Sequence, residues 1–244
     1  PRLQCTKDMR FPHAYLSIDR FLGNIMQRRT LISAAAAIAA SASVPAFAGT
    51  LGTDYVVLDT PLPNAEGTLI KVFSYDCPFC FKYDIGVDPK VMPRIEKEVG
   101  LKFKPMHLET KGMYGRCASV FLAMCMLRDE KAGVSIEDKN SLFKKAKDSI
   151  YNAYHKKQER WTSGEAAFLK TMTDATGLTA DDYEKAKADP AVTALADSWK
   201  MTYPVAKIQG IPAYVINGKY LIMTKTIRNF DGMVELVKEL AAKK

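Results

Sequence analysis

The sequence is poor in cysteine and contains no apolar run long enough to cross a membrane. Five cysteines among 244 residues are too few to form a disulfide scaffold in place of a hydrophobic core. Because 48% of the residues are apolar and 25% are charged, the composition is that of a folded globular protein rather than a disordered one. A chain of this length has room for one large domain or two small ones.

The sequence also has little net charge once its N-terminal segment is set aside. Six of the 35 basic and two of the 27 acidic residues lie within residues 1–48, so the rest of the chain carries 29 basic and 25 acidic residues, a net charge of +4. This excess is too small and too scattered to indicate a nucleic-acid-binding protein. It is enough to attract acidic partners or anionic surfaces.

Residues 26–48 have the features of an export signal that is cleaved off. Arg28 and Arg29 follow Met26, an apolar run covers residues 31–40, and Ala46-Phe47-Ala48 has the small-x-small pattern of a cleavage site. A transmembrane anchor is the alternative, but the run is rich in alanine, interrupted by serine and proline, and too short. The two arginines also fit the twin-arginine route, but because every such signal has basic residues we expect the Sec route.

Residues 1–25 precede the start methionine that we infer, and we expect them to be an upstream extension outside the native product. The mature protein is then expected to begin near Gly49 and to enter an oxidising compartment. There, a Cys-x-x-Cys motif is able to act as an oxidant.

The segment 68–80 predicts a buried strand that leads directly into a helix. Its strand part is almost continuously apolar and aromatic, with Leu69, Ile70, Val72, Phe73 and Tyr75. Pro78 suits the first helical position, which makes Cys77 the N-cap residue. There, free backbone N–H groups and the helix dipole favour the thiolate of Cys77. The spacing to Cys80 permits a reversible disulfide. Zinc sites use the same spacing, but a pair that ends a strand and opens a helix favours redox chemistry.

The rest of the pattern predicts the order β, α, β, a block of helices, then β, β, α. We expect Asp88 to cap a helix that ends at Gly100, and Thr162 and Glu165 to form a capping box for a helix that ends at Gly177. Strands are expected at 55–58, 68–75, 101–106, 213–216 and 219–223, with a hairpin turn at 217–218 and a terminal helix at 230–242. This order fits an α/β thioredoxin-like domain, a mixed sheet flanked by helices, made of residues 49–112 and 201–244 and split by an all-helical insertion at residues 113–200.

With the segment 209–213 (Gln-Gly-Ile-Pro-Ala) added, the chain resembles the DsbA family of bacterial periplasmic thiol oxidases over residues 49–244, and above all its DsbL subgroup. The blocks that carry the resemblance are 70–75, 77–80, 107–112, 206–210 and 217–221. The resemblance implies that Pro212 follows a cis bond and faces the redox-active disulfide of Cys77 and Cys80, which leaves the backbone free to pair with substrate and keeps metal away. The alternative for Pro212 is an ordinary proline at a strand edge. Phe79 and Ile211 are expected to offer an apolar surface to substrates.

Three residues depart from the DsbA pattern or complicate it. Phe79 replaces a histidine between the cysteines, so no imidazole is available to stabilise the thiolate, and the N–H groups at the helix terminus and nearby cations must do more of it. Lys71, six residues before Cys77, replaces a buried acid; its charge would favour ionised sulfur and could handle protons for Cys80. Alternatively, Lys71 extends outward and affects nothing. Asp76 opposes the thiolate if its charge lies close.

The expected reaction is disulfide donation to reduced exported proteins, with Cys77 attacked and Cys80 as the leaving group. The resemblance implies a periplasmic location, a quinone-linked membrane reoxidant of the DsbB/DsbI kind, and a narrow range of clients that includes arylsulfate sulfotransferase. We expect a monomer that needs neither cofactor nor metal and binds no nucleic acid.

Two alternatives remain open. A reductase or isomerase would use the same cysteines in the opposite redox state. A zinc-binding module would combine them with Cys117 and Cys125, which we otherwise expect to be buried inert thiols. His107 and His155 have no partner at catalytic or ligand spacing and are expected to be structural.

Overall fold

The computed structural model describes residues 49–243. The predictions for residues 1–25 and 26–48 fall outside this part of the chain. Within residues 49–243, the structure contains no helix with the length and apolar character needed to cross a membrane.

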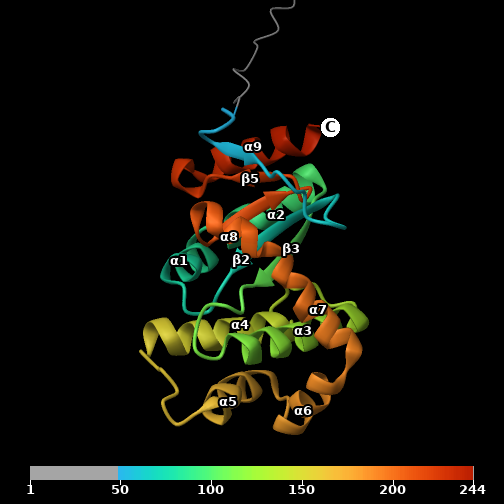
Figure 1. The fold of residues 1–244 in the computed structure, drawn as a ribbon, viewed down its shortest axis with the longest axis vertical. Helices are drawn as coiled ribbons and strands as arrows, with labels where there is room; N and C mark the ends of the chain where they lie inside the picture. Colours follow the sequence, from blue (N-terminus) through green and yellow to red (C-terminus); the bar gives the residue numbers. More distant parts are fainter. Residues whose placement is uncertain (1–48, 244) are drawn as a thin grey trace, which may run out of the picture. The chain divides into compact units, whose positions relative to one another are not determined.

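A mixed five-stranded sheet with the strand order β1-β5-β4-β2-β3 forms the centre of the described chain (Figure 1). Its strands are β1 (Tyr55–Val57), β2 (Thr68–Phe73), β3 (Lys102–His107), β4 (Ala213–Ile216) and β5 (Tyr220–Ile222). β2 runs parallel to β3 and antiparallel to β4. All six residues of β2 are buried, as its apolar run predicts. β2 therefore leads the chain through the interior of the sheet to the cysteine motif.

The helices match the predicted order. They are α1 (Pro78–Gly86), α2 (Asp88–Val99), α3 (Gly115–Ala132), α4 (Leu142–Tyr151), α5 (Glu165–Thr176), α6 (Ala180–Ala188), α7 (Pro190–Ser198), α8 (Tyr203–Gln209) and α9 (Phe230–Ala242), with a π-helix at Asn152–Lys156 and 3-10 segments at Trp199–Thr202 and Thr224–Thr226. Every element between β3 and β4 is helical, as expected for residues 113–200. The division into two domains at these boundaries stays a prediction.

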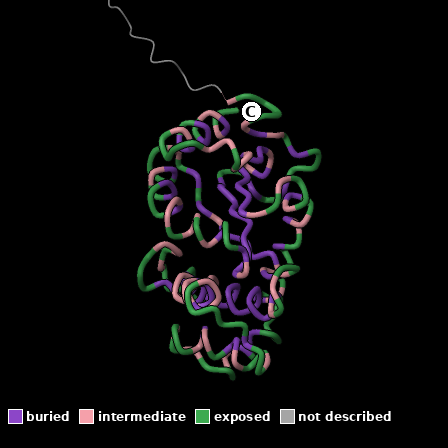
Figure 2. The backbone as a smooth tube through the Cα atoms, turned by 90° about the vertical axis from the view of Figure 1, so that its left-hand side faces the viewer, coloured by how far each residue is buried: buried purple, intermediate pink, exposed green. Residues whose placement is uncertain are grey.

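The sheet separates two apolar cores. On one face, Leu69 and Tyr214 pack in a cluster with residues of α2 and α9. On the other, Ile70 and Val72 belong to a cluster that continues into α3 and α4, which pack against each other. Figure 1 shows α3 and α4 below the sheet and α5 and α6 below them. In Figure 2 the buried residues are concentrated along the strands. Successive side chains of β2 thus point into different cores, and Lys71 points to the same face as Leu69.

The predicted hairpin turn between β4 and β5 is confirmed. Asn217 and Gly218 both have positive φ, 51° and 67°, as a type I′ turn requires. Gly218 also packs closely against the loop between β1 and β2. A Cβ atom at this position would lie 2.5 Å from the carbonyl oxygen of Leu62.

Both predicted side-chain caps are wrong. Val87 is the N-cap residue of α2, and the carboxylate of Asp88 turns inward to bind Lys71 and Tyr214 instead. α5 starts only at Glu165, and its N-cap residue is Gly164. Thr162 lies inside the turn that the hydrogen bond from the N–H of Gly164 to the carbonyl of Trp161 closes, so it does not cap the helix. A capping box does occur, but between Thr179 and Asp182 at the start of α6.

A buried aspartate joins the two helices that pack below the sheet. Asp129, near the end of α3, is 2% exposed. Its carboxylate accepts hydrogen bonds from the backbone N–H groups of Leu142 and Phe143, both at 2.9 Å, and from the hydroxyl of Ser141 at 2.7 Å. Ser141 is the N-cap residue of α4, and Leu142 and Phe143 are its first two residues. A side chain of α3 therefore supplies the acceptors for N–H groups of α4 that have no intrahelical carbonyl partner.

We expect Asp129→Ala to lower the free energy of unfolding by about 2–4 kcal/mol, because it leaves buried N–H groups and a hydroxyl without their acceptor. Urea unfolding monitored by circular dichroism measures the change. Asp174→Ala is the matched control, since it removes an exposed carboxylate paired with Lys170 and should cost less than about 0.5 kcal/mol. Equal losses in the two variants would show that Asp129 contributes nothing as a cap.

Candidate active site

Cys77 is the N-cap residue of α1, as the sequence predicts. Pro78 occupies the first helical position, and the sulfur of Cys77 accepts a hydrogen bond from the backbone N–H of Cys80 at 3.1 Å. The two cysteines are free thiols in the structure, so it describes the dithiol form. Both are buried, but Cys77 is 6% exposed whereas Cys80 is 0% exposed. Cys77 is therefore the sulfur that a substrate reaches.

The two thiols differ in acidity. The pKa of Cys77 is lowered, first by the hydrogen bond from the side chain of Cys80 and then by the backbone N–H groups of Cys80 and Phe79, which together outweigh burial. Burial raises the pKa of Cys80 well above its usual value, and the neighbouring Cys77 raises it further. The structure therefore favours a thiolate on Cys77 and a protonated thiol on Cys80.

The loop before β4 brings a cis proline next to the cysteines. The Ile211–Pro212 bond is cis, as the family resemblance implies, and the sulfur of Cys77 lies 3.4 Å from the carbonyl oxygen of Ile211. Pro212 is buried and precedes a strand that is paired on both sides, so the alternative of a strand-edge proline is wrong. The structure thus brings the loop that contains Pro212, which is distant in the sequence, next to the motif of Cys77 and Cys80.

The expected apolar contacts lie at the surface beside this site. Phe79 is 62% exposed, and the ammonium of Lys82 lies 5.5 Å from the centre of its ring. Ile211 is partly buried and packs on the core. Asp76 accepts a hydrogen bond from the hydroxyl of Ser74 at 2.8 Å, and its charge raises the pKa of Cys77. The roles of Phe79 and Ile211 in substrate binding stay predictions.

Lys71 is buried, so the alternative that it extends outward is wrong. It is 2% exposed, and its ammonium pairs with Asp88 and, at 3.5 Å, with Asp84. Asp84 also binds Lys147 of α4 at 2.5 Å, and the hydroxyl of Tyr214 donates to Asp88 at 2.6 Å. Burial alone would lower the pKa of Lys71, but the two carboxylates raise it, so the lysine stays charged. That charge in turn lowers the pKa of Cys80, in opposition to burial.

Two histidines that lie far from the motif in the sequence contact Tyr75, two residues before Cys77. His155, in the π-helix after α4, donates from Nε2 to the carbonyl of Tyr75 at 2.8 Å and stacks on Phe81 with ring centres 4.8 Å apart. His107 is fully buried; its Nδ1 bonds the hydroxyl of Ser119, and burial lowers its pKa to about 3, which keeps it neutral. His107 is structural, as expected. The position of His155 at the active-site turn was missed, because only the fold connects residues 80 positions apart.

The other two cysteines within residues 49–243, Cys117 and Cys125, are buried. Burial raises the pKa of Cys117 to about 12 and that of Cys125 even further, as expected for inert thiols. The zinc alternative required them to approach Cys77 and Cys80. Within residues 49–243, the structure places no group of three or more His, Cys, Asp or Glu side chains where it could hold a metal ion.

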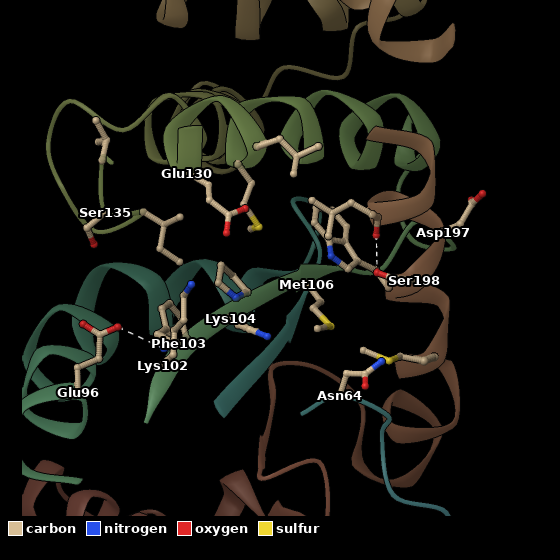
Figure 3. A pocket seen from close by; sticks show the side chains of 18 of the residues that line it. Asn64, Glu96, Lys102, Phe103, Lys104, Met106, Glu130, Ser135, Asp197 and Ser198 are labelled. Carbon is tan, nitrogen blue, oxygen red and sulfur yellow. Dashed lines mark hydrogen bonds between the residues drawn. The ribbon is translucent and has the colours of Figure 1, made fainter. Parts of the chain in front are cut away.

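A cavity of about 900 Å³ lies elsewhere, between β3 and the helices α3 and α7 (Figure 3). Its apolar wall includes Phe103, Met106 and Trp199, and its rim carries Glu96 and Lys104. None of the predicted site residues lines it, so the candidate chemistry belongs to the turn between β2 and α1.

The strand leads into two thiols whose pKa values are shifted in opposite directions, and a cis proline from a distant loop lies beside them. This arrangement defines a thioredoxin-like thiol:disulfide oxidoreductase. No family model matches the chain. The chain is 53% identical to the thiol:disulfide interchange protein DsbL of Escherichia coli O6:H1 (strain CFT073), over 85% of this chain and 93% of the relative. It is 51% identical to the DsbL of Lelliottia amnigena, over 90% of this chain and 97% of the relative.

The crystal structure of DsbL from Salmonella enterica serovar Typhimurium matches the fold with a TM-score of 0.76 and 55% identity, over 81% of this chain and 99% of that one. The chain therefore belongs to the DsbL family of thiol:disulfide interchange proteins. This confirms the family resemblance and the thioredoxin-like fold drawn from the sequence.

We expect Asp76→Asn to lower the pKa of Cys77 further, because it removes the negative charge that opposes the thiolate. Thiolate absorbance at 240 nm, followed as the reduced protein is titrated, measures the shift. Asp59→Asn is the control, since the structure assigns no contact between that exposed residue and the cysteines. A pKa that stays in place or rises in Asp76→Asn would contradict this electrostatic account.

The lowered pKa of Cys77 also predicts a pH-dependent stability of the dithiol form. Because the folded protein releases this proton at a lower pH than the unfolded chain does, the stabilisation is complete above the unfolded pKa and is lost as the pH falls through the folded pKa. The unfolding free energy of the reduced protein should therefore increase relative to that of Cys77→Ala as the pH rises from acidic values to the ordinary thiol pKa of about 8.5. A constant difference between the two proteins across this range would refute the prediction.

Proposed function

We propose that this oxidoreductase works as an oxidase that donates the Cys77–Cys80 disulfide to exported proteins in the periplasm. The observation that carries the proposal is the stabilised sulfur of Cys77. A stabilised thiolate makes the dithiol form favourable, so the disulfide form gives up its S–S bond readily. The export signal at residues 26–48 and the resemblance to periplasmic thiol oxidases support the location.

The reaction takes place in two exchanges. A client thiolate attacks the sulfur of Cys77, the S–S bond breaks, and its electron pair leaves on Cys80. A second client thiolate then attacks the client sulfur of this mixed disulfide, so that Cys77 leaves as a thiolate. Two electrons have passed from the client dithiol to the enzyme. Of the two protons that the client thiols lose, one ends on Cys80 and the other in solvent.

The side chains around the pair support this direction. Cys77 is the reachable sulfur, and the carbonyl of Ile211 beside it is positioned to meet an extended client chain. Phe79 offers an exposed apolar ring next to the attacked sulfur. From the family resemblance we include a quinone-linked membrane protein of the DsbB/DsbI kind as reoxidant and arylsulfate sulfotransferase as a client of a monomeric enzyme.

We expect the redox potential of the pair to lie above that of the glutathione couple, higher than about −200 mV. Equilibration of the purified protein with mixtures of reduced and oxidised glutathione measures it. A potential near about −270 mV, the range of thioredoxin, would instead support the reductase alternative.

Client capture tests the same proposal in cells. In Cys80→Ala, the Cys77 thiolate attacks the disulfide of an oxidised client and one client sulfur leaves as a thiolate. The resulting mixed disulfide should accumulate, because Cys80 is no longer present to attack the sulfur of Cys77 and free the client. Cys117→Ala, with both active-site thiols intact, is the control and should trap none. Absence of any trapped client in Cys80→Ala would count against disulfide donation, and the identity of trapped clients tests the sulfotransferase assignment.

A further inference from the structure

Tyr151, the last residue of α4, holds a hydroxyl group that lacks a hydrogen-bond partner. The residue is 1% exposed, and among the buried side-chain nitrogen and oxygen atoms of residues 49–243 its hydroxyl is the one left unpaired. A tyrosine hydroxyl in a protein interior normally finds an acceptor, because an unpaired one costs free energy that phenylalanine would not. The unpaired group therefore calls for an explanation.

The ring of Tyr151 packs against aromatic residues on both sides of the cysteine motif. Its centre is 5.7 Å from that of Phe81, the residue that follows Cys80, and 6.1 Å from that of Phe73 at the end of β2. The ammonium of Lys147 is 5.4 Å from the ring centre. The charged and titratable groups that act on the hydroxyl are, in decreasing order, Cys80, Asp84, Cys77 and Asp88.

The chemistry of Cys80 creates a need for a hydrogen-bond donor. When the disulfide opens, Cys80 becomes a thiolate in a place that is 0% exposed to water. A buried thiolate is unfavourable unless a donor approaches it. The ammonium of Lys71 is already paired with Asp84 and Asp88, so it acts on this sulfur through its charge. The hydroxyl of Tyr151 is a donor that no other group uses.

We propose that the Tyr151 hydroxyl donates a hydrogen bond to the sulfur of Cys80 whenever that sulfur carries negative charge. The O–H bond stays intact. The interaction stabilises Cys80 as leaving group when a client thiolate attacks Cys77, and as nucleophile when the disulfide re-forms. This role rests on the proposed assignment of Cys77 and Cys80 as the reacting pair, and adds a residue of the insertion to it.

The test replaces Tyr151 with phenylalanine, which keeps the ring and removes the hydroxyl. In the Cys77→Ala background, Tyr151→Phe should raise the pKa of Cys80 by about 1 or more. With both cysteines present, it should slow reduction of the disulfide by a cysteine-containing peptide at least about threefold, since the leaving sulfur carries only part of its charge in the transition state. Because the change removes an unpaired buried group, the reduced variant should fold and be at least as stable as the wild type.

Tyr183→Phe is the matched control. Tyr183 is likewise a buried tyrosine, and the cysteine that raises the pKa of its hydroxyl, after burial, is Cys117 rather than Cys80. It should leave the pKa of Cys80 and the rate of reduction unchanged. A Cys80 pKa that is the same with and without the Tyr151 hydroxyl would overturn the inference, even if the rate fell. Disulfide exchange that survives in Cys77→Ala would overturn the proposed function instead, so the two failures are distinguishable.

Discussion

The interaction on which the active site depends is the one between the sulfur of Cys77 and the N-terminal amides of α1. It exists because β2, which is buried on both faces, fixes the position of the turn that follows it, and because Pro78 starts the helix directly after Cys77. The N–H of Cys80 then meets the Cys77 sulfur at 3.1 Å. With phenylalanine at position 79, the turn itself offers no imidazole, so the amides and the neighbouring thiol account for the lowered pKa.

A second constraint is the need to keep the buried ammonium of Lys71 paired with carboxylates. Lys71 replaces an acidic residue of the DsbA pattern, and a lone ammonium at that depth would not stay charged. Asp84 and Asp88 supply two carboxylates, and Lys147, which also pairs with Asp148, supplies a second cation. The cluster also joins four elements, β2, α1, α2 and α4. The reversal of charge at position 71 is thus compensated by residues on helices rather than by the adjacent strand, where Pro105 faces Lys71.

Sequence patterns predicted those features that neighbouring residues decide. The buried strand, the Cys77 cap, the Asn217-Gly218 turn and the terminal helix all follow from local periodicity and backbone preference. One of the two cap errors arose where distant groups competed for a side chain. Asp88 has the right type and place for a cap, but Lys71 and Tyr214 bind its carboxylate. The burial of Lys71 was undecided for the same reason, since its partners lie 13 and 17 residues away along the chain.

The insertion belongs to the redox site rather than merely covering it. α4 and the π-helix after it contribute Lys147, Tyr151 and His155, and each contacts a different part of the cysteine motif or its supports: Asp84, the ring of Phe81 and the carbonyl of Tyr75. The π-helix matters here, since a wider turn shifts the residues that follow it relative to a regular α-helix. Because these contacts come from residues 147–155, the sheet and the insertion together form the surroundings of the cysteine motif.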